Sequence, residues 1–470
     1  MLMMHPRLPH VHSFLRPAGL RRGAVAMVAR LMVAFCCHFG KMTASQAARQ
    51  PKDDPRHPAA IGRFLGRQRW ARGDWVAPLR AAVLAGEAGK AGTWFFLLDQ
   101  TCSSRQGDKT PNTFSTGNRK RRPCKGRRYS NKKSAPKRCH AFVFGLLLTP
   151  GGLRIPYRKS YYTPEYARQK GHPFRTQAEL GAELVRELVL PAGARVVVLG
   201  DTAYEAACVH QACAQRDFHW ITPCNTERVL EGAKPRPKVR SLVGQVSAQQ
   251  FVAVKVHPGT DPYAAQRRWS ASRRGRQFQG RTYWVLKQRH DVRSVGAVSV
   301  FVSTTKRPKP GEPLFEPKVL LSDELGLTAR DAVLRYTLRW QVELFFKEMK
   351  GVLGMADYRF RDFQRVERWV DVAVCTFLYL EAYRQRQLGR PPGQQRLGPK
   401  ERAWWEAQRA AGPCQAARAE VEQGELRWLA QRLRTAGGCR RLRRLLRQAR
   451  PGGRRRAGFG PHRKNAITDP

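Results

Sequence analysis

The segment 328–351, TARDAVLRYTLRWQVELFFKEMKG, places apolar and polar residues at the spacing of an α-helix. At about 100° per residue, an arc of roughly 80° collects its apolar side chains, which are Leu334, Leu338, Val342, Phe345 and Met349. An arc of roughly 60° on nearly the opposite side collects Tyr336, Arg339, Glu343 and Lys350. Thr328 followed by Asp331 approximates a capping box, and Gly351 is a natural stop. We therefore expect one amphipathic helix, whose polar face is either solvated surface or a functional row.

Short apolar runs elsewhere predict buried strands, and two of them lead into an aspartate. The run 93–101 reads TWFFLLDQT and places Asp99 at its C-terminal end, while 196–199 is continuously apolar with Asp201 just beyond it. Capping of the following helix is an alternative role for Asp201. Further strands are expected at 140–149, 153–161, 218–223 and 296–304, and further helices after a Thr176–Glu179 cap and over 363–388.

These elements and the shifts in composition divide the chain into five regions. Residues 1–90 are basic and helical, which suggests DNA binding, and residues 391–470 form an Arg-rich tail. Residues 91–225 and 296–390 hold the strands and helices of one α/β unit, which a mixed sheet flanked by helices would accommodate. Residues 226–295, with strand-like pieces between Pro and Gly, predict a β-rich insertion before the 328–351 helix.

The charge of the chain narrows the class of partner. Its 470 residues include 87 Lys and Arg against 35 Asp and Glu, a net charge of +52, which favours a nucleic acid over other polyanions. We find no uninterrupted apolar run of membrane-spanning length, so no membrane role is expected. The eleven cysteines lack a CxxC pair or regular spacing, which favours reduced structural thiols over a zinc site. We expect a cytoplasmic, nucleoid-associated protein.

A dense basic stretch follows the strand that contains Asp99. Eleven of the twenty residues in 119–138 are Lys or Arg and none is acidic. A solvated loop is one interpretation. Because the stretch is tethered beside Asp99, we favour a loop that contacts DNA phosphates. The side chains proposed for this contact are Arg119, Lys120, Arg121, Arg122, Arg127, Arg128, Lys132 and Lys133.

Three carboxylates stand out by their context. Asp99 and Asp201 follow strands, and Glu343 lies on the polar face of the late helix, so only the fold can bring them together. Convergent carboxylates in a basic protein suit Mg²⁺, with Mn²⁺ as a possible substitute, because such ions prefer hard oxygen ligands. Two ions roughly 3.5–4 Å apart would activate an attacking oxygen and stabilise the leaving oxygen of a phosphodiester.

The same residues resemble a known family. Tyr336, Arg339, Glu343 and Lys350 reproduce the spacing Tyr-x2-Arg-x3-Glu-x6-Lys, and Asp99 lies in LLDQT while Asp201 lies in GDTAY. In this combination the chain resembles the DDE-type insertion-sequence transposases that are marked by that signature, over roughly residues 90–385. The complete set of residues is specific evidence for this resemblance, whereas any one part of it alone would be weak evidence.

The resemblance implies an RNase H-like catalytic core, interrupted by the β-rich insertion. It implies an enzyme that nicks the ends of its own mobile element and joins the freed 3′-hydroxyls to target DNA, usually as a homodimer that holds two ends. Asp99, Asp201 and Glu343 would be the metal ligands. Arg339 and Lys350 would grip phosphate, and Tyr336 would contact the same double-stranded DNA end.

Two other classes of protein share part of this pattern. A different RNase H-like nuclease would have the acidic trio but no reason to keep Tyr336, Arg339 and Lys350 in register. A non-catalytic or domesticated DNA-binding protein derived from a transposase would keep the charge and the fold, and only the loss of an acidic residue would reveal it. All three acidic residues are present.

Overall fold

The structure of the chain is a computed structural model, and the residues it describes are 10–38, 41–49, 56–67, 70–71, 73–105, 110–116, 137–232, 237–257, 260–267 and 281–388. Contacts divide the chain into Met1–Arg418 and Ala419–Pro470, and every described residue belongs to the first unit. The tail expected at 391–470 lies outside the described residues, as do the eight basic side chains proposed between Arg119 and Lys133.

Within these ranges, ten strands form one mixed sheet. The first half of the sheet consists of β1 (Thr93–Arg105), β2 (Phe114–Thr116), β3 (Lys137–Leu148), β4 (Arg154–Ser160), β5 (Arg195–Leu199) and β6 (His219–Pro223). Strands β1, β5 and β6 run parallel to one another, whereas β3 is antiparallel to β1, β2 and β4. The apolar runs of β1 and β5 are buried, as their continuous hydrophobicity predicts.

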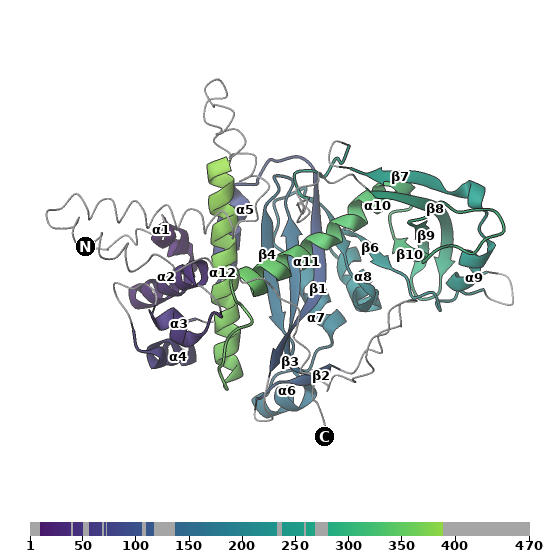
Figure 1. The fold of residues 1–470 in the computed structure, drawn as a ribbon. Helices are drawn as coiled ribbons and strands as arrows, with labels where there is room; N and C mark the ends of the chain where they lie inside the picture. The colour runs from purple at the N-terminus through teal and green to yellow at the C-terminus, as the bar shows by residue number, and fades with distance from the viewer. Residues whose placement is uncertain are drawn as a thin grey trace, which may run out of the picture. The chain divides into compact units, whose positions relative to one another are not determined.

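The sheet continues past β6 through antiparallel strands. They are β10 (Lys318–Ser322), β9 (Gly296–Thr304), β8 (Arg281–Val292) and β7 (Val252–Val256), in that spatial order. Strand β10 pairs with both β6 and β9, so the strands of the expected 226–295 region extend the main sheet (Figure 1). The α/β architecture with a mixed sheet and flanking helices is therefore confirmed.

Helices flank the sheet and build the N-terminal region. Those of the N-terminal region are α1 (Val11–Leu15), α2 (Arg22–Cys37), α3 (Ala44–Arg49), α4 (Pro58–Gly66) and α5 (Ala77–Ala85). Those that follow are α6 (Pro164–Lys170), α7 (Gln177–Arg186), α8 (Ala207–Ala214), α9 (Val239–Gln245) and α12 (Phe363–Leu388), with short 3-10 turns at Arg16–Ala18, Thr202–Tyr204 and Ala248–Gln250. In the described part of the chain, none of the helices combines the length and the apolar character needed to cross a lipid bilayer.

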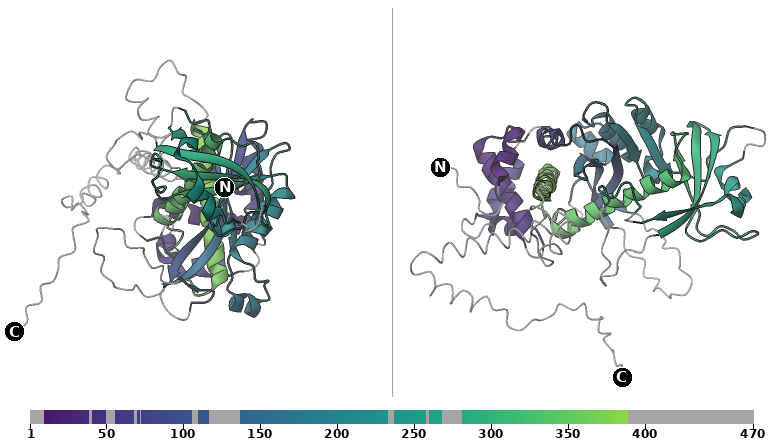
Figure 2. Two further views of the ribbon diagram at one scale, coloured as in Figure 1. Left: turned by 90° about the vertical axis from the view of Figure 1, so that its right-hand side faces the viewer. Right: turned by 90° about the horizontal axis from the view of Figure 1, so that it is seen from above.

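Helix α12 lies between the N-terminal helices and the sheet, as Figures 1 and 2 show from different directions. It packs against α2 and α4 on one side and against β4 on the other. The Trp369 ring meets the Phe35 ring edge-on at 4.8 Å, and Arg368 Nη1 donates to the Leu65 carbonyl at 2.7 Å. The apolar stripe that predicts this helix is buried, and it comprises Val366, Val370, Ala373, Phe377 and Leu380.

The expected 328–351 helix is present but is not one uninterrupted α-helix. It consists of α10 (Ala329–Tyr336), a 3-10 turn (Thr337–Arg339), α11 (Trp340–Lys347) and a π turn (Glu348–Val352). Thr337 Oγ1 donates to the Leu334 carbonyl at 3.0 Å, a local bond that competes with regular helix geometry. The π turn shows that Gly351 does not end the helix, because Leu353 N donates to the Glu348 carbonyl. The predicted core face is buried throughout, and the Thr328 cap is present.

The sheet is tightly packed beside Asp99. Gly145 on β3 pairs with Leu98 of β1, and a Cβ added to Gly145 would lie 2.1 Å from the Phe96 ring. We expect Gly145→Ala to reduce the free energy of unfolding by about 1–3 kcal/mol, because the buried ring must move to admit a methyl group. Chemical denaturation would measure the loss. Gly244→Ala is the matched control, since its Cβ would meet no atom within 4 Å, and an equal loss in both variants would contradict the packing argument.

Candidate active site

Parallel pairing of β1 with β5 places Asp99 and Asp201 next to each other. The last residues in register are Leu97 and Leu199, and each aspartate follows two residues later. The sequence analysis placed Asp99 at the end of its strand, and this prediction is wrong. The strand continues because β1 also pairs with β3, from Asp99 opposite Phe144 to Arg105 opposite Arg138. Asp99 therefore lies where β1 has lost its neighbour β5 on one side but keeps β3 on the other.

Asp201 is also a cap, the alternative that its position suggested. Its Oδ1 accepts from the Ala203 backbone N–H at 2.9 Å, at the start of the 3-10 turn Thr202–Tyr204. This bond fixes the direction of the side chain relative to the strand end. The chain passes close to itself here, because a Cβ on Gly200 would lie 2.7 Å from Tyr204 Cβ. The cap thus orients Asp201 and engages one of its two carboxylate oxygens.

The face of the sheet that Asp99 shares is the face covered by α11. Cross-strand neighbours point to the same side of a sheet, so Asp99 and Phe144 share one face. The Phe144 ring packs on Phe345 and Phe346 of α11, with centroids 5.4 and 5.5 Å apart. Glu343 lies on this same helix, which brings it to the side of the sheet where Asp99 points.

Arg339 joins two of the three carboxylates directly. Its Nη1 lies 3.1 Å from Asp99 Oδ2, and its Nη2 lies 2.9 Å from Glu343 Oε1. The two nitrogens of one planar guanidinium therefore bridge residues that are distant in sequence. Tyr336 hydrogen bonds to the same Arg339 side chain. The structure thus brings together Asp99, Glu343, Arg339 and Tyr336 from the predicted set.

The ionisation of Asp99 shows that all three carboxylates interact. Burial raises the pKa of Asp99 to about 6, and although Arg339 opposes this rise, the charges of Asp201 and Glu343 add to it. Burial likewise raises the pKa of Tyr336 to about 12, so this phenol keeps its proton at neutral pH. The site therefore holds a carboxylate that is costly to ionise unless more positive charge arrives.

The donor set suits a divalent ion, but its present arrangement does not yet form a metal cage. Three carboxylates supply the hard oxygen ligands that Mg²⁺ and Mn²⁺ prefer. Among the residues that the structure describes, no group of three or more His, Cys, Asp or Glu side chains is positioned to hold a metal ion. The guanidinium of Arg339 instead lies between Asp99 and Glu343, where a shared cation would bind both.

Lys350 is placed differently from a freely projecting surface lysine. Its Nζ donates to the Cys102 carbonyl of β1 at 2.8 Å and lies 6.0 Å from the centre of the Phe346 ring. Burial lowers the pKa of Lys350 from its usual value. The π turn directs this lysine toward β1, three residues beyond Asp99 along the strand. A phosphate-binding role for Lys350 stays a prediction, as do the roles of the other candidate DNA-binding side chains.

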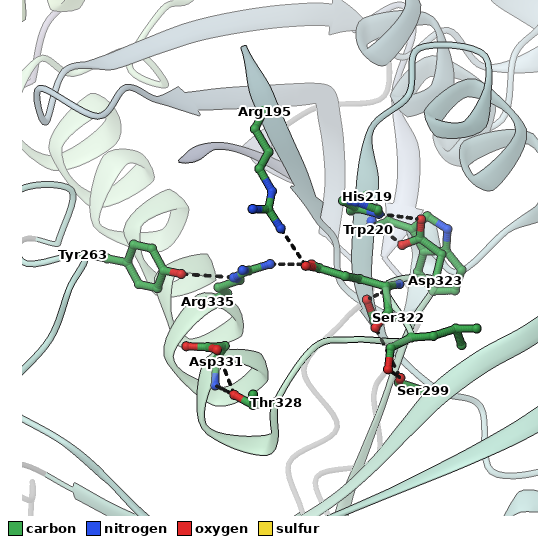
Figure 3. Close-up of polar contacts among 12 residues, drawn as sticks. Arg195, His219, Trp220, Tyr263, Ser299, Ser322, Asp323, Thr328, Asp331 and Arg335 are labelled. Carbon is green, nitrogen blue, oxygen red and sulfur yellow. Dashed lines mark hydrogen bonds and ion pairs between the residues drawn. The ribbon is translucent and has the colours of Figure 1, made fainter. Parts of the chain in front are cut away.

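An ion-pair network anchors α10, the N-terminal half of the 328–351 helix. Glu324, just after β10, pairs with Arg195 at 2.7 Å and also with Arg335 of α10. Arg335 Nε donates to the Tyr263 hydroxyl at 3.0 Å. In Figure 3 the Tyr263 hydroxyl faces the Arg335 side chain, and the Arg195 side chain points from β5 toward the same region. These contacts tie α10 to the beginning of β5, the strand that leads into Asp201.

A second network holds the C-terminal end of the same helix. Arg154 on β4, only 1% exposed, lies with its Nη2 3.0 Å from Glu348 in the π turn and 2.6 Å from Glu381 of α12. One buried cation thus joins β4, the end of the Glu343 helix and α12. The sequence analysis missed Arg154 and Glu324. No local pattern marks them, because each is one charged residue whose partners come from distant elements.

Two family models match this chain. The family described as a transposase DDE domain matches residues 175–378, which include Asp201 and Glu343, and the family described as a DDE superfamily endonuclease matches residues 18–245, which include both aspartates. No curated protein matches the chain. The mixed sheet with flanking helices is consistent with the RNase H-like fold of DDE endonucleases, and the matches support a DDE-type transposase. Such enzymes act on DNA and generally use divalent metal ions.

We expect Asp99→Asn to stabilise the metal-free protein at pH 8 by about 1–3 kcal/mol, because the amide avoids the cost of ionising a buried acid. Folding raises the pKa of Asp99 from 3.8 to about 6. Between pH 3.8 and about 6 the folded protein therefore holds a proton that the unfolded chain has released, and the wild-type protein loses stability as the pH rises through this range. Urea unfolding at several pH values would measure the difference. The advantage of the variant should shrink toward about pH 4, and an advantage independent of pH would rule out this explanation.

Arg154→Met should destabilise the protein by about 3–5 kcal/mol, since it removes the cation that faces the buried Glu381 carboxylate. Thermal or urea unfolding gives the measurement. Arg175→Met is the control. The side chain of Arg175 is 46% exposed, so its ion pair with Glu183 should contribute at most about 1 kcal/mol. Similar losses in the two variants would mean that burial of the Arg154 network is not what matters.

Proposed function

We propose that the chain is a DNA transposase of the group marked by the Tyr-x2-Arg-x3-Glu-x6-Lys signature, which cleaves the ends of its mobile element and transfers them to target DNA. The observation that carries this proposal is the Arg339 bridge between Asp99 and Glu343. It joins the strand and the helix that the signature requires, and Asp201 acts electrostatically on the same groups. Charge and family matches support the same class.

In this proposal Asp99, Asp201 and Glu343 hold two Mg²⁺ ions, for which Mn²⁺ can substitute. The bound metal supplies activation of the attacking oxygen and stabilisation of the leaving oxygen. The capping bond orients Asp201, and the paired strand orients Asp99, so both ligands are fixed before DNA arrives. Glu343 is more exposed than Asp99, with 38% of its side chain accessible against 15%, so DNA that approaches from solvent can reach it.

The cationic side chains of the site position the DNA backbone. Arg339 presents a planar fork that matches the oxygens of a phosphate, and Lys350 offers a compact charge beside β1. Tyr336 keeps its hydroxyl proton and can donate to the same phosphate. The partners are double-stranded element ends and target DNA, held by a homodimer, with the basic stretch 119–138 and the N-terminal helices adding phosphate contacts.

Glu343→Gln should lower Mg²⁺-dependent cleavage of DNA that flanks the gene by at least on the order of 10²–10³-fold, because the amide is a much poorer metal ligand. DNA binding should stay close to that of the wild-type protein. A gel-based cleavage assay with a parallel binding assay measures both. Glu312→Gln, which makes the same change in an exposed ion pair, should cleave normally. Undiminished cleavage by Glu343→Gln would falsify the proposed mechanism.

Lys350→Ala should weaken binding to the element ends and lower the slope of log K against log salt by about 1, because one phosphate contact is lost. Titration of labelled duplex at several salt concentrations gives this slope. Lys309→Ala, which removes an exposed lysine of the ion pair with Glu312, is the control for a change in net charge. If Lys350→Ala behaves like this control in binding and in cleavage, Lys350 does not contact phosphate.

A further inference from the structure

Both oxygens of the Asp99 carboxylate already accept bonds from the protein. Oδ1 accepts from the Gln100 backbone N–H at 2.8 Å, and Oδ2 accepts from Arg339 at 3.1 Å. The side chain of Asp99 is only 15% exposed, so solvent ions reach it with difficulty. Arg339 also donates a hydrogen bond from Nη2 to Glu343 Oε1. A divalent ion can therefore share Asp99 and Glu343 only if the guanidinium moves away from between them.

We propose that Arg339 is an internal cation that closes the metal site of the free protein, and that a DNA phosphate opens the site by drawing the guanidinium away. This inference rests on the proposed function and adds a regulation of the same site. Free protein would bind metal weakly, whereas DNA and metal would each strengthen the binding of the other. Such a coupling restricts cleavage to complexes in which a phosphodiester is in place.

The bridging position of Arg339 has a simple electrostatic origin. Asp99, Asp201 and Glu343 repel one another, and the guanidinium offsets this repulsion when no metal is bound. A metal ion must compete with that bridge, so its apparent affinity falls by the fraction of molecules in which the bridge is open. The guanidinium in turn needs an acceptor of equal geometry, and a phosphate offers two oxygens at the spacing of its fork.

The 3-10 turn gives Arg339 a position from which it can make this exchange. Arg339 ends the turn Thr337–Arg339, between α10 and α11, and its guanidinium is held by side chains rather than by backbone carbonyls in the contacts described above. Its side chain is 21% exposed, so part of it already faces solvent. Rotation of one side chain is therefore enough to open the site, without a change in the strands or in the helix axis.

The first test measures the binding of Mn²⁺ to the whole protein without DNA. Isothermal titration calorimetry and the electron paramagnetic resonance signal of free Mn²⁺ both report this binding. Arg339→Gln removes the bridge, and Arg339→Lys keeps the charge without the two-pronged guanidinium. Arg330→Gln makes the same charge change at an exposed position of α10 and is the control. We expect Mn²⁺ to bind Arg339→Gln at least about tenfold more tightly than wild type, Arg339→Lys to bind it more tightly than wild type, and Arg330→Gln to match wild type.

Other outcomes would overturn the proposal in distinct ways. Affinity in Arg339→Gln equal to or below that of wild type would show that the bridge does not hold the metal site closed. An increase in Arg339→Gln alone, with Arg339→Lys equal to wild type, would show that net charge acts without the bridge. If Mn²⁺ affinity is the same in wild type, Arg339→Gln and Asp99→Asn, the carboxylates do not bind metal, and the proposed function fails together with the inference.

The second test measures the coupling itself. Duplex DNA of random sequence should tighten Mn²⁺ binding to wild type by about tenfold, and Mn²⁺ should tighten DNA binding by the same factor, since coupling between two ligands is reciprocal. In Arg339→Gln the factor should fall toward one, while Arg330→Gln should keep it. Equal coupling in Arg339→Gln and wild type would assign the effect to another part of the protein.

Discussion

The parallel pairing between β1 and β5 is the constraint on which the site depends. It matches Leu97 with Leu199, and two residues of further extension then bring the two aspartates to neighbouring positions. A shift of one residue in this register would turn one aspartate to the opposite face of the sheet. The apolar residues of β5 are buried on both faces of the sheet and resist such a shift, because it would force closely packed side chains to repack. Core packing therefore determines the spacing of two acidic side chains.

The helix that contributes Glu343 is positioned from both ends. Glu324 and Arg335 tie its first half to the start of β5, and Arg154 ties its last turn to β4 and α12. Ion pairs in exposed positions contribute little to stability. The pairs of Arg154 and the Arg335–Glu324 pair are largely buried and join separate elements, whereas Arg195 is 57% exposed and adds less. The helix is thus fixed along its length over the sheet face on which Asp99 lies. The helical turn that separates the two anchors contains Arg339.

Much of the fold could be predicted from local patterns, because burial imposes a period on the sequence. The five apolar residues of the 328–351 segment and the stripe of α12 are buried as their spacing predicts. Asp99 was expected at a strand end, yet the strand continues, since it pairs with a strand that is distant in sequence, from Asp99 opposite Phe144 to Arg105 opposite Arg138. The Arg339 bridge could not be predicted either, although the signature names all of its members. It depends on which of several nearby charges approach most closely, and that is decided by tertiary structure.

The location of α12 has a consequence for dissecting this protein by truncation. Its aromatic and aliphatic side chains contact Phe35 and the α4 region on one side and β4 on the other. Removing the first 90 residues would bare a strip of hydrophobic surface along a 26-residue helix, and such surfaces promote aggregation. An insoluble fragment would then say nothing about which region recognises DNA. Point substitutions on the outer surfaces of α2, α3 and α4 leave the packing of α12 against α2 and α4 intact, and are therefore the better way to map DNA recognition.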